Sequence, residues 1–83
     1  MIKAKVISLK GGYPMDQLDF NKLNASIGDE FIVGAFSIGQ SCSSVQLNHK
    51  GFFNTVFFEF YEDGVLFDPF SDNRFNPYLG IFK

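Results

Sequence analysis

The strongest structural signal in the chain is an aromatic run that favours a β-strand and ends at a tight turn. Residues 52–61 read Phe-Phe-Asn-Thr-Val-Phe-Phe-Glu-Phe-Tyr, and Asp63-Gly64 then separates this run from the apolar residues 65–67. Aromatic and β-branched residues favour strands, and an Asp-Gly pair between two such runs is typical of a hairpin. The run therefore predicts a long strand that returns antiparallel to itself.

Three further segments show strand patterns bounded by glycine, proline or asparagine. They are residues 2–9, 30–38 and 43–47, and residues 48–51 form a hairpin loop before the aromatic run. Both faces of residues 30–38 are apolar, which is typical of a central strand or of one covered on both sides. Gly34 interrupts this segment and predicts a bulge or a bend. After an irregular Pro-containing segment, residues 78–82 form a candidate edge strand.

Residues 15–24 fit a short helix and an alternating strand about equally well. Asp16 suits the cap of a helix, whereas Leu18 and Phe20 also fit alternation. We therefore expect at most one helix of one to two turns.

The spacing of these segments predicts a mainly β fold for residues 1–83. A chain of 83 residues holds one small core, so we expect a single domain. We predict a five- to six-stranded antiparallel meander or partial small barrel, with at most one short helix. The alternative is a sheet with one short helix packed across it. Six inward positions form the expected core: Phe31, Val33, Val45, Val56, Phe58 and Phe60.

The sequence contains no constellation that predicts catalysis or metal binding. Cys42 and His49 are the one nucleophile–base pair available, but a loop histidine beside a strand thiol lacks the usual activating environment. Asp68, Asp72 and Asn73 miss the ligand spacing of a calcium loop, and we expect them to bond to nearby backbone instead. We therefore expect no catalytic residue, no metal and no cofactor.

Composition places the chain inside a cell and away from membranes. The single cysteine excludes an internal disulfide, which fits a reducing compartment. Nothing in the sequence resembles a membrane span or a signal peptide, so we expect a cytoplasmic location. Phe, Ile, Asn and Lys are frequent while arginine occurs only at position 74, a usage typical of AT-rich genomes and consistent with a bacteriophage or mobile element.

The aromatic residues are the strongest functional signal. Aromatic residues make up 18% of the chain and include twelve phenylalanines, more than a small core hides easily, so we expect an exposed patch. Alternation from residue 52 places Phe53, Phe57, Glu59 and Tyr61 on the outer face. Acidic side chains border this face. The predicted partner-binding site is Phe53, Phe57, Glu59, Tyr61, Glu62, Asp63, Asp68 and Asp72.

Aromatic anchors within a charged rim are typical of protein–protein interfaces. We therefore predict a small inhibitor or adaptor that binds a host or cellular protein, with an anti-defence or host-takeover role if it is phage-encoded. An acidic rim also steers toward basic surfaces such as the groove of a nucleic-acid enzyme. Exposed aromatics and an edge strand predict a homodimer as a further form of association.

Two alternatives use other chemistry. The same rings, with Lys3, Lys5, Lys10 and Lys50, would suit a binder of single-stranded nucleic acid or nucleotides. Residues 50–58 resemble part of the aromatic strands of cold-shock domains, but the family's glycine between the aromatics is absent, so the sequence assigns no family. Five of the nine acidic residues lie in residues 51–83, which disfavours a phosphate backbone. The third class is an enzyme that depends on Cys42.

Overall fold

The computed structural model describes residues 1–39 and 42–79. It contains six strands, one α-helix and two single-turn 3₁₀ helices. In chain order these elements are β1 (Ile2–Val6), α1 (Pro14–Asn21), β2 (Glu30–Ile38), β3 (Ser43–Leu47), β4 (Gly51–Asn54), η1 (Thr55–Phe57), β5 (Phe58–Glu62), β6 (Val65–Phe67) and η2 (Pro69–Ser71). The mainly β prediction with one short helix is confirmed.

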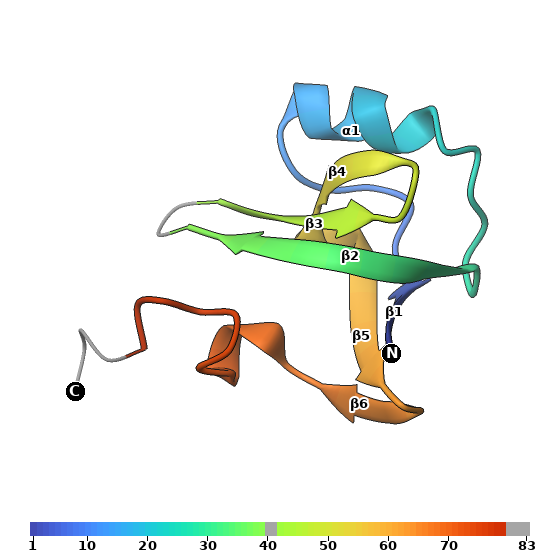
Figure 1. The fold of residues 1–83 in the computed structure, drawn as a ribbon. Coiled ribbons are helices and arrows are strands. Elements are labelled where there is room, and N and C mark those ends of the chain that lie inside the picture. Colours follow the sequence, from blue (N-terminus) through green and yellow to red (C-terminus); the bar gives the residue numbers. More distant parts are fainter. Residues whose placement is uncertain (40–41, 80–83) are drawn as a thin grey trace.

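All six strands form one antiparallel sheet in the order β4-β3-β2-β1-β5-β6. Consecutive strands pair as in a meander, except that β4 and β5 lie apart and β5 pairs instead with β1, which lies between β2 and β5. Strand β2 is therefore central, as predicted. The register shifts between Val33 and Ala35, which confirms the irregularity expected at Gly34. Figure 1 shows the result: β2 and β3 run across the direction of β1 and β5.

The connection from β4 to β5 requires the sheet to curl. These strands are four places apart in the sheet, yet only the three residues of η1 join them. In a flat sheet four spacings would separate them by about 19 Å. The four peptide steps from Asn54 to Phe58 span at most about 14 Å. The open sheet is therefore partly rolled, and β4 and β6 remain its two edges within the described residues.

The core lies inside this curl and is closed by α1. Phe20 of α1 stacks on Phe57 of η1, with ring centroids 4.0 Å apart and planes inclined by 10°, and meets Phe58 edge-on. The other core residues come from four strands: Ala4, Val6, Val45, Leu47, Phe53 and Phe60. The helix therefore packs next to β4, where Figure 1 places it.

Local sequence explains where α1 begins. Tyr13 is the N-cap residue, and its backbone N–H donates to Asp16 Oδ2 at 2.8 Å. Pro14 follows at the first helical position, where its missing N–H costs nothing. The sequence pattern thus placed the helix start one residue late and made Asp16 the cap, whereas Asp16 acts from inside the first turn.

The aromatic run does not form one strand, and this is the main correction to the sequence-based prediction. Asn54 Oδ1 accepts the N–H of Val56 at 2.9 Å and thereby starts the turn of η1. The inserted turn resets the alternation, and a shift of one residue exchanges the two faces of a strand. Phe53 and Phe57 are consequently buried, with 7% and 0% of their surface exposed.

The six predicted core residues differ in how far they are buried. Val45, Phe58 and Phe60 are buried as expected. Phe31 and Val33 are half-buried against the core. Val56 is 47% exposed, so its prediction as a core residue is wrong.

The chain after β6 is irregular, as expected. Pro69 is buried in η2, and Phe75 packs against Phe36 with centroids 4.8 Å apart. Tyr78 and Leu79 lie in a turn, and the rest of the predicted edge strand falls outside the described residues.

Candidate protein-binding surface

The predicted aromatic face is not assembled, because two of its four members are in the core. Glu59 and Tyr61 of β5 do lie together on the outer face, where the Tyr61 hydroxyl donates to Glu59 Oε2 at 2.8 Å. That hydrogen bond, followed by desolvation and the nearby carboxylates, raises the pKa of Tyr61. Phe53 and Phe57 are unavailable for contact with a partner in this fold.

Two of the five acidic residues of the predicted rim, Glu62 and Asp72, are paired with Arg74. The guanidinium binds both oxygens of Glu62, at 2.9 and 2.7 Å, and also contacts Asp72 at 2.8 Å. It lies over the ring of Phe75, 4.8 Å from the centroid. Hydrogen bonds from Arg74 hold the pKa of Glu62 and of Asp72 below their ordinary values and raise that of Arg74.

The remaining rim residues have different surroundings. Asp63 pairs with the amino group of Met1 at 2.7 Å, which lowers the pKa of its carboxyl group. Asp68 caps η2 by accepting the Phe70 N–H and the Ser71 hydroxyl, at 2.9 and 3.0 Å. Asp68 and Asp72 thus bond to nearby chain, as the sequence predicted.

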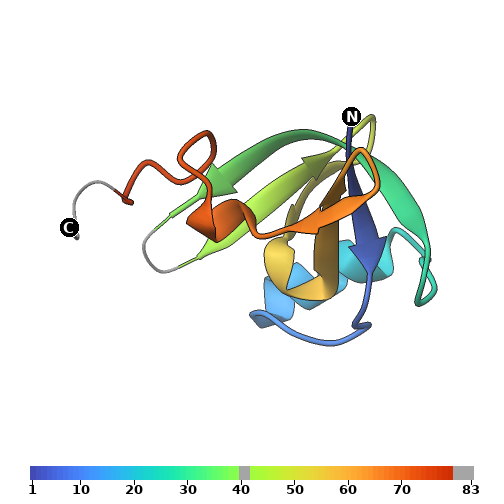
Figure 2. The same cartoon turned by 90° about the horizontal axis from the view of Figure 1, so that it is seen from below.

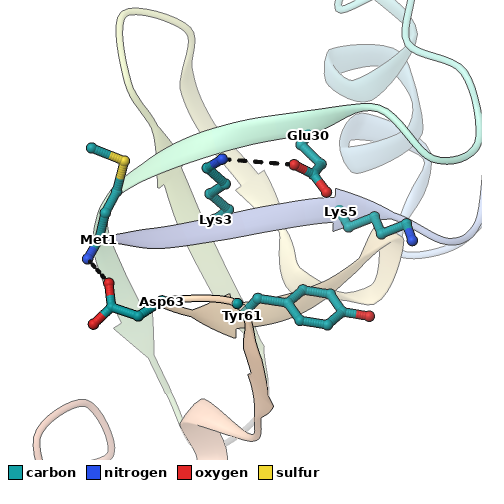
Figure 3. Close-up of a pocket in the computed structure, with 7 residues that line it drawn as sticks. Met1, Lys3, Lys5, Glu30, Tyr61 and Asp63 are labelled. Carbon is teal, nitrogen blue, oxygen red and sulfur yellow. Dashed lines mark hydrogen bonds and ion pairs between the residues drawn. The ribbon is translucent and has the colours of Figure 1, made fainter.

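A hollow of about 490 Å³ opens on the outer face of β1, β2 and β5 (Figure 3). Its lining combines cations and carboxylates: Met1, Lys3, Lys5, Glu30, Tyr61, Asp63 and Gly64. Lys3 lies 3.9 Å from Glu30, and the register sets Lys5 opposite both Glu30 and Glu59. Lys3 and Lys5, two of the four lysines that the nucleic-acid alternative would use, therefore line the same hollow as Tyr61. Acidic side chains opposite them balance their positive charge. Lys10 and Lys50 lie in separate loops.

A second, more apolar region surrounds η1. Two hollows of about 390 Å³ each adjoin there, because both are lined by Thr55 and Phe70. The first also involves the loop before α1 and the ends of β2 and β3: Gly12, Tyr13, Gly39, Cys42, Ser43, Asn54 and Val56. The second lies over β5 and β6: Phe58, Glu59, Phe60, Leu66, Phe67, Asp68 and Pro69. Figure 2 shows η2 (orange) and the loop before α1 (blue) on either side of η1 (yellow).

Gly11 allows the loop before α1 to pass this close to η1, and Gly12 allows it to pass close to the first turn of α1. A Cβ on Gly11 would lie 2.9 Å from Val56 Cγ1, and one on Gly12 would lie 2.8 Å from Asp16 Cβ. Gly12 also has a φ of 70°, which side chains rarely adopt. The Gly11-Gly12 pair therefore allows Tyr13 to lie at the rim of the first hollow.

Phe70 is held in place from both sides of η2. Asp68 caps the turn before it, and Asn76 Nδ2 donates to the Phe70 carbonyl at 2.7 Å. The ion pair between Arg74 and Glu62 also attaches the segment that follows η2 to β5. The ring itself remains 40% exposed between the two hollows.

We refer to Tyr13, Thr55, Val56, Leu66 and Phe70 as the Phe70 surface. Four of these side chains are exposed hydrophobic groups, with Tyr13 at 66% and Leu66 at 59%. Sequence reasoning missed this surface because Tyr13 and Phe70 lie outside the periodic segments. The available signal was an aromatic residue next to a proline, at Tyr13-Pro14 and at Pro69-Phe70.

The candidate catalytic pair and the candidate metal ligands do not come together in the described part of the chain. Cys42 and His49 lie beyond opposite ends of β3, a strand whose five residues span about 16 Å. In residues 1–39 and 42–79, no group of three or more potential metal ligands comes together. No helix in this part of the chain has the length and apolar character needed to cross a membrane.

Comparison with known proteins gives one match. The family model described as "Bacteriophage T4 protein Y07B" matches residues 1–80. No curated protein and no solved structure matches the chain.

Proposed function

Because the chain belongs to the bacteriophage T4 protein Y07B family, we propose that it is a phage protein that works by binding another protein, as an inhibitor or an adaptor. It acts by covering a surface of its partner in the cytoplasm of the host, and it catalyses no reaction. An enzyme that handles nucleic acid, or a defence factor, is the partner class that fits an acidic binder best.

The observation that carries this proposal is the Phe70 surface. Tyr13, Val56 and Phe70 expose apolar area around adjoining hollows, and such areas on small proteins are typical of interaction sites. Local hydrogen bonds hold both aromatic residues before any partner arrives. A preformed surface loses less conformational entropy on binding, which favours affinity.

The first test combines affinity capture with matched variants. The immobilised protein is exposed to lysate of the host bacterium, and captured proteins are identified and then titrated by calorimetry. We expect Phe70→Ala and Tyr13→Ala each to weaken the recovered partner's binding by about 30-fold, as loss of an aromatic hot spot does. Ile27→Ala removes an exposed hydrophobic group elsewhere, at 58% between the 40% of Phe70 and the 66% of Tyr13, and serves as the control.

The result also locates the site. If Tyr61→Ala abolishes binding while Phe70→Ala does not, the partner uses the outer face of β5. Cys42 lines the first hollow, so its test needs both readouts: if Cys42→Ser abolishes activity in a folded protein that still binds the captured partner, the binding-module proposal is wrong and an enzyme mechanism replaces it.

One observation favours the nucleic-acid alternative, namely that Lys3, Lys5 and Tyr61 line one hollow. That function predicts binding of a single-stranded oligonucleotide that weakens steeply with salt. It also predicts loss of that binding in Lys3→Gln/Lys5→Gln. Absence of oligonucleotide binding at low salt removes this candidate.

A further inference from the structure

We infer that the Phe70 surface binds a basic segment of its partner protein, one in which Lys or Arg residues accompany apolar side chains. This inference rests on the proposed function and adds the chemistry of the partner. It follows from the shape of the surface, from the charges beside it, and from which of those charges are already paired.

The shape requires an occupant with more than one side chain. Thr55 and Phe70 line both hollows, so the two form one continuous surface with Phe70 between them. Tyr13 borders the first hollow and Leu66 the second. A peptide segment that crosses Phe70 can place one apolar side chain in each hollow.

Three carboxylates border this surface. Glu59 and Asp68 line the second hollow, and Asp16 reaches Asn54, a residue of the first, at 3.2 Å. None of the residues that line either hollow is basic, in the part of the chain that the structure describes. The surface is therefore negative at both ends.

Within the described part of the chain, two acids of the predicted rim, Glu59 and Asp68, differ from the other three in having no cationic partner within 4 Å, and Asp16 shares this property. Glu62, Asp63 and Asp72 each have a cationic partner at 2.7 to 2.8 Å.

By contrast, neutral donors supply the hydrogen bonds of Asp16, Glu59 and Asp68: backbone N–H groups, the Asn54 amide and the hydroxyls of Tyr61 and Ser71. Among residues 1–39 and 42–79 none of the three has an ion-pair partner. Their charge is thus free to attract a cation from a partner.

Charge complementarity also favours a basic peptide over two other occupants, a nucleic acid and a second copy of this chain. A nucleic-acid backbone would meet three carboxylates and be repelled. A second copy related by two-fold symmetry would bring Asp16, Glu59 and Asp68 against the same set of acids. A segment rich in Lys or Arg gains attraction from each of them.

The test is a selection from a library of random peptides on the immobilised protein, with Phe70→Ala protein as the counter-selection. Enriched peptides are synthesised and titrated by fluorescence anisotropy. We expect enriched sequences to combine Lys or Arg with apolar residues. Their affinity should fall about tenfold, with a flatter salt dependence, for Asp16→Asn/Glu59→Gln/Asp68→Asn. These replacements remove the charges and keep one acceptor oxygen in each side chain, and the second oxygen of Asp68, which accepts from the Ser71 hydroxyl, becomes an amide NH2.

The matched control removes three acidic charges elsewhere, in Asp19→Asn/Glu30→Gln/Asp63→Asn, and should change affinity by no more than about threefold. If the first triple variant fails to fold, replacing Lys or Arg by Gln in the peptide tests the same contacts from the other side.

Each outcome is decisive. Peptides without excess basic residues that still require Phe70 overturn the inference and leave the proposed function standing. Peptides that bind Phe70→Ala as well as the parent, or no enrichment at all, also overturn the inference, and the affinity capture from host lysate then decides the proposed function separately.

Discussion

The side chain of Asn54 determines which of the surrounding phenylalanines are buried. Its oxygen starts the turn of η1, and its amide donates to Asp16 of α1. Because the turn intervenes, β4 buries an odd-numbered phenylalanine, Phe53, whereas β5 buries the even-numbered Phe58 and Phe60. Sequence alternation alone, carried across Asn54, gives the opposite assignment for Phe53 and Val56.

Replacement of Phe57 tests this assignment directly. The side chain is fully buried and stacks on Phe20, so we expect Phe57→Ala to lower the free energy of unfolding by about 3–5 kcal/mol. Against a total of about 5–15 kcal/mol, that change is measurable by urea denaturation. The control is Phe52→Ala, whose ring is 52% exposed. Equal stability of the two variants would mean that Phe57 faces solvent after all.

At the scale of elements, Arg74 determines how η2 and the residues after it are attached to the sheet. Its contacts with Glu62 and Asp72 join the end of β5 to the irregular segment that follows η2. Phe70, the central residue of the proposed binding surface, lies within this attached region. The position of Phe70 therefore depends on an ion pair that the sequence pattern did not indicate.

The ion pair gives a pH dependence of known sign. Arg74 lowers the pKa of Glu62 and Asp72 below their ordinary values of 4.5 and 3.8. Their contribution to stability is therefore complete above about pH 5 and is lost as the pH falls through the lowered pKa values. We expect Arg74→Met to lower the melting temperature at about pH 6, and this difference to shrink toward about pH 2. A difference independent of pH would contradict the role of the ion pair, and Lys22→Met is the control.

Elements whose bounds depend on nearby turn residues were predictable from the sequence. Elements that depend on the rolling of the sheet were not. The Asp63-Gly64 turn needs positive φ at both residues, which the pair adopts at 50° and 86°, and β2 has the bounds that its flanking turns predicted. The break at residues 55–57 starts at the local cap made by Asn54, but it also depends on the path that links β4 to β5, which the alternation of the aromatic run does not encode. Tyr13 and Phe70 were missed because irregular segments have no periodicity to show which side is exposed.

At the scale of the whole molecule, the two open edges of the sheet bear on self-association. The homodimer expected from the sequence remains a prediction. Strand β6 is the edge that fits it better, because Val65 and Leu66 are 68% and 59% exposed there. Edge strands with exposed apolar residues tend to pair with another chain unless a charge prevents it.

Light scattering over a range of concentrations tests the homodimer. We expect the apparent mass to rise above the 9.4 kDa of one chain, and Val65→Lys to keep it at that value. Val65 lies outside the Phe70 surface, so this variant should still bind the partner. A wild-type mass that stays at one chain at every concentration would exclude the homodimer.

The double pairing of β1 has a consequence for the protein during its synthesis. This strand is synthesised before the other five described strands, but one of its two neighbours is β5, whose residues reach Glu62. Until β5 emerges, one side of β1 has unpaired backbone groups and the apolar residues Ala4 and Val6 have no complete core to enter. Native structure is therefore completed only after β5 has been synthesised, and a nascent chain interrupted before β5 should expose β1 to chaperones and proteases.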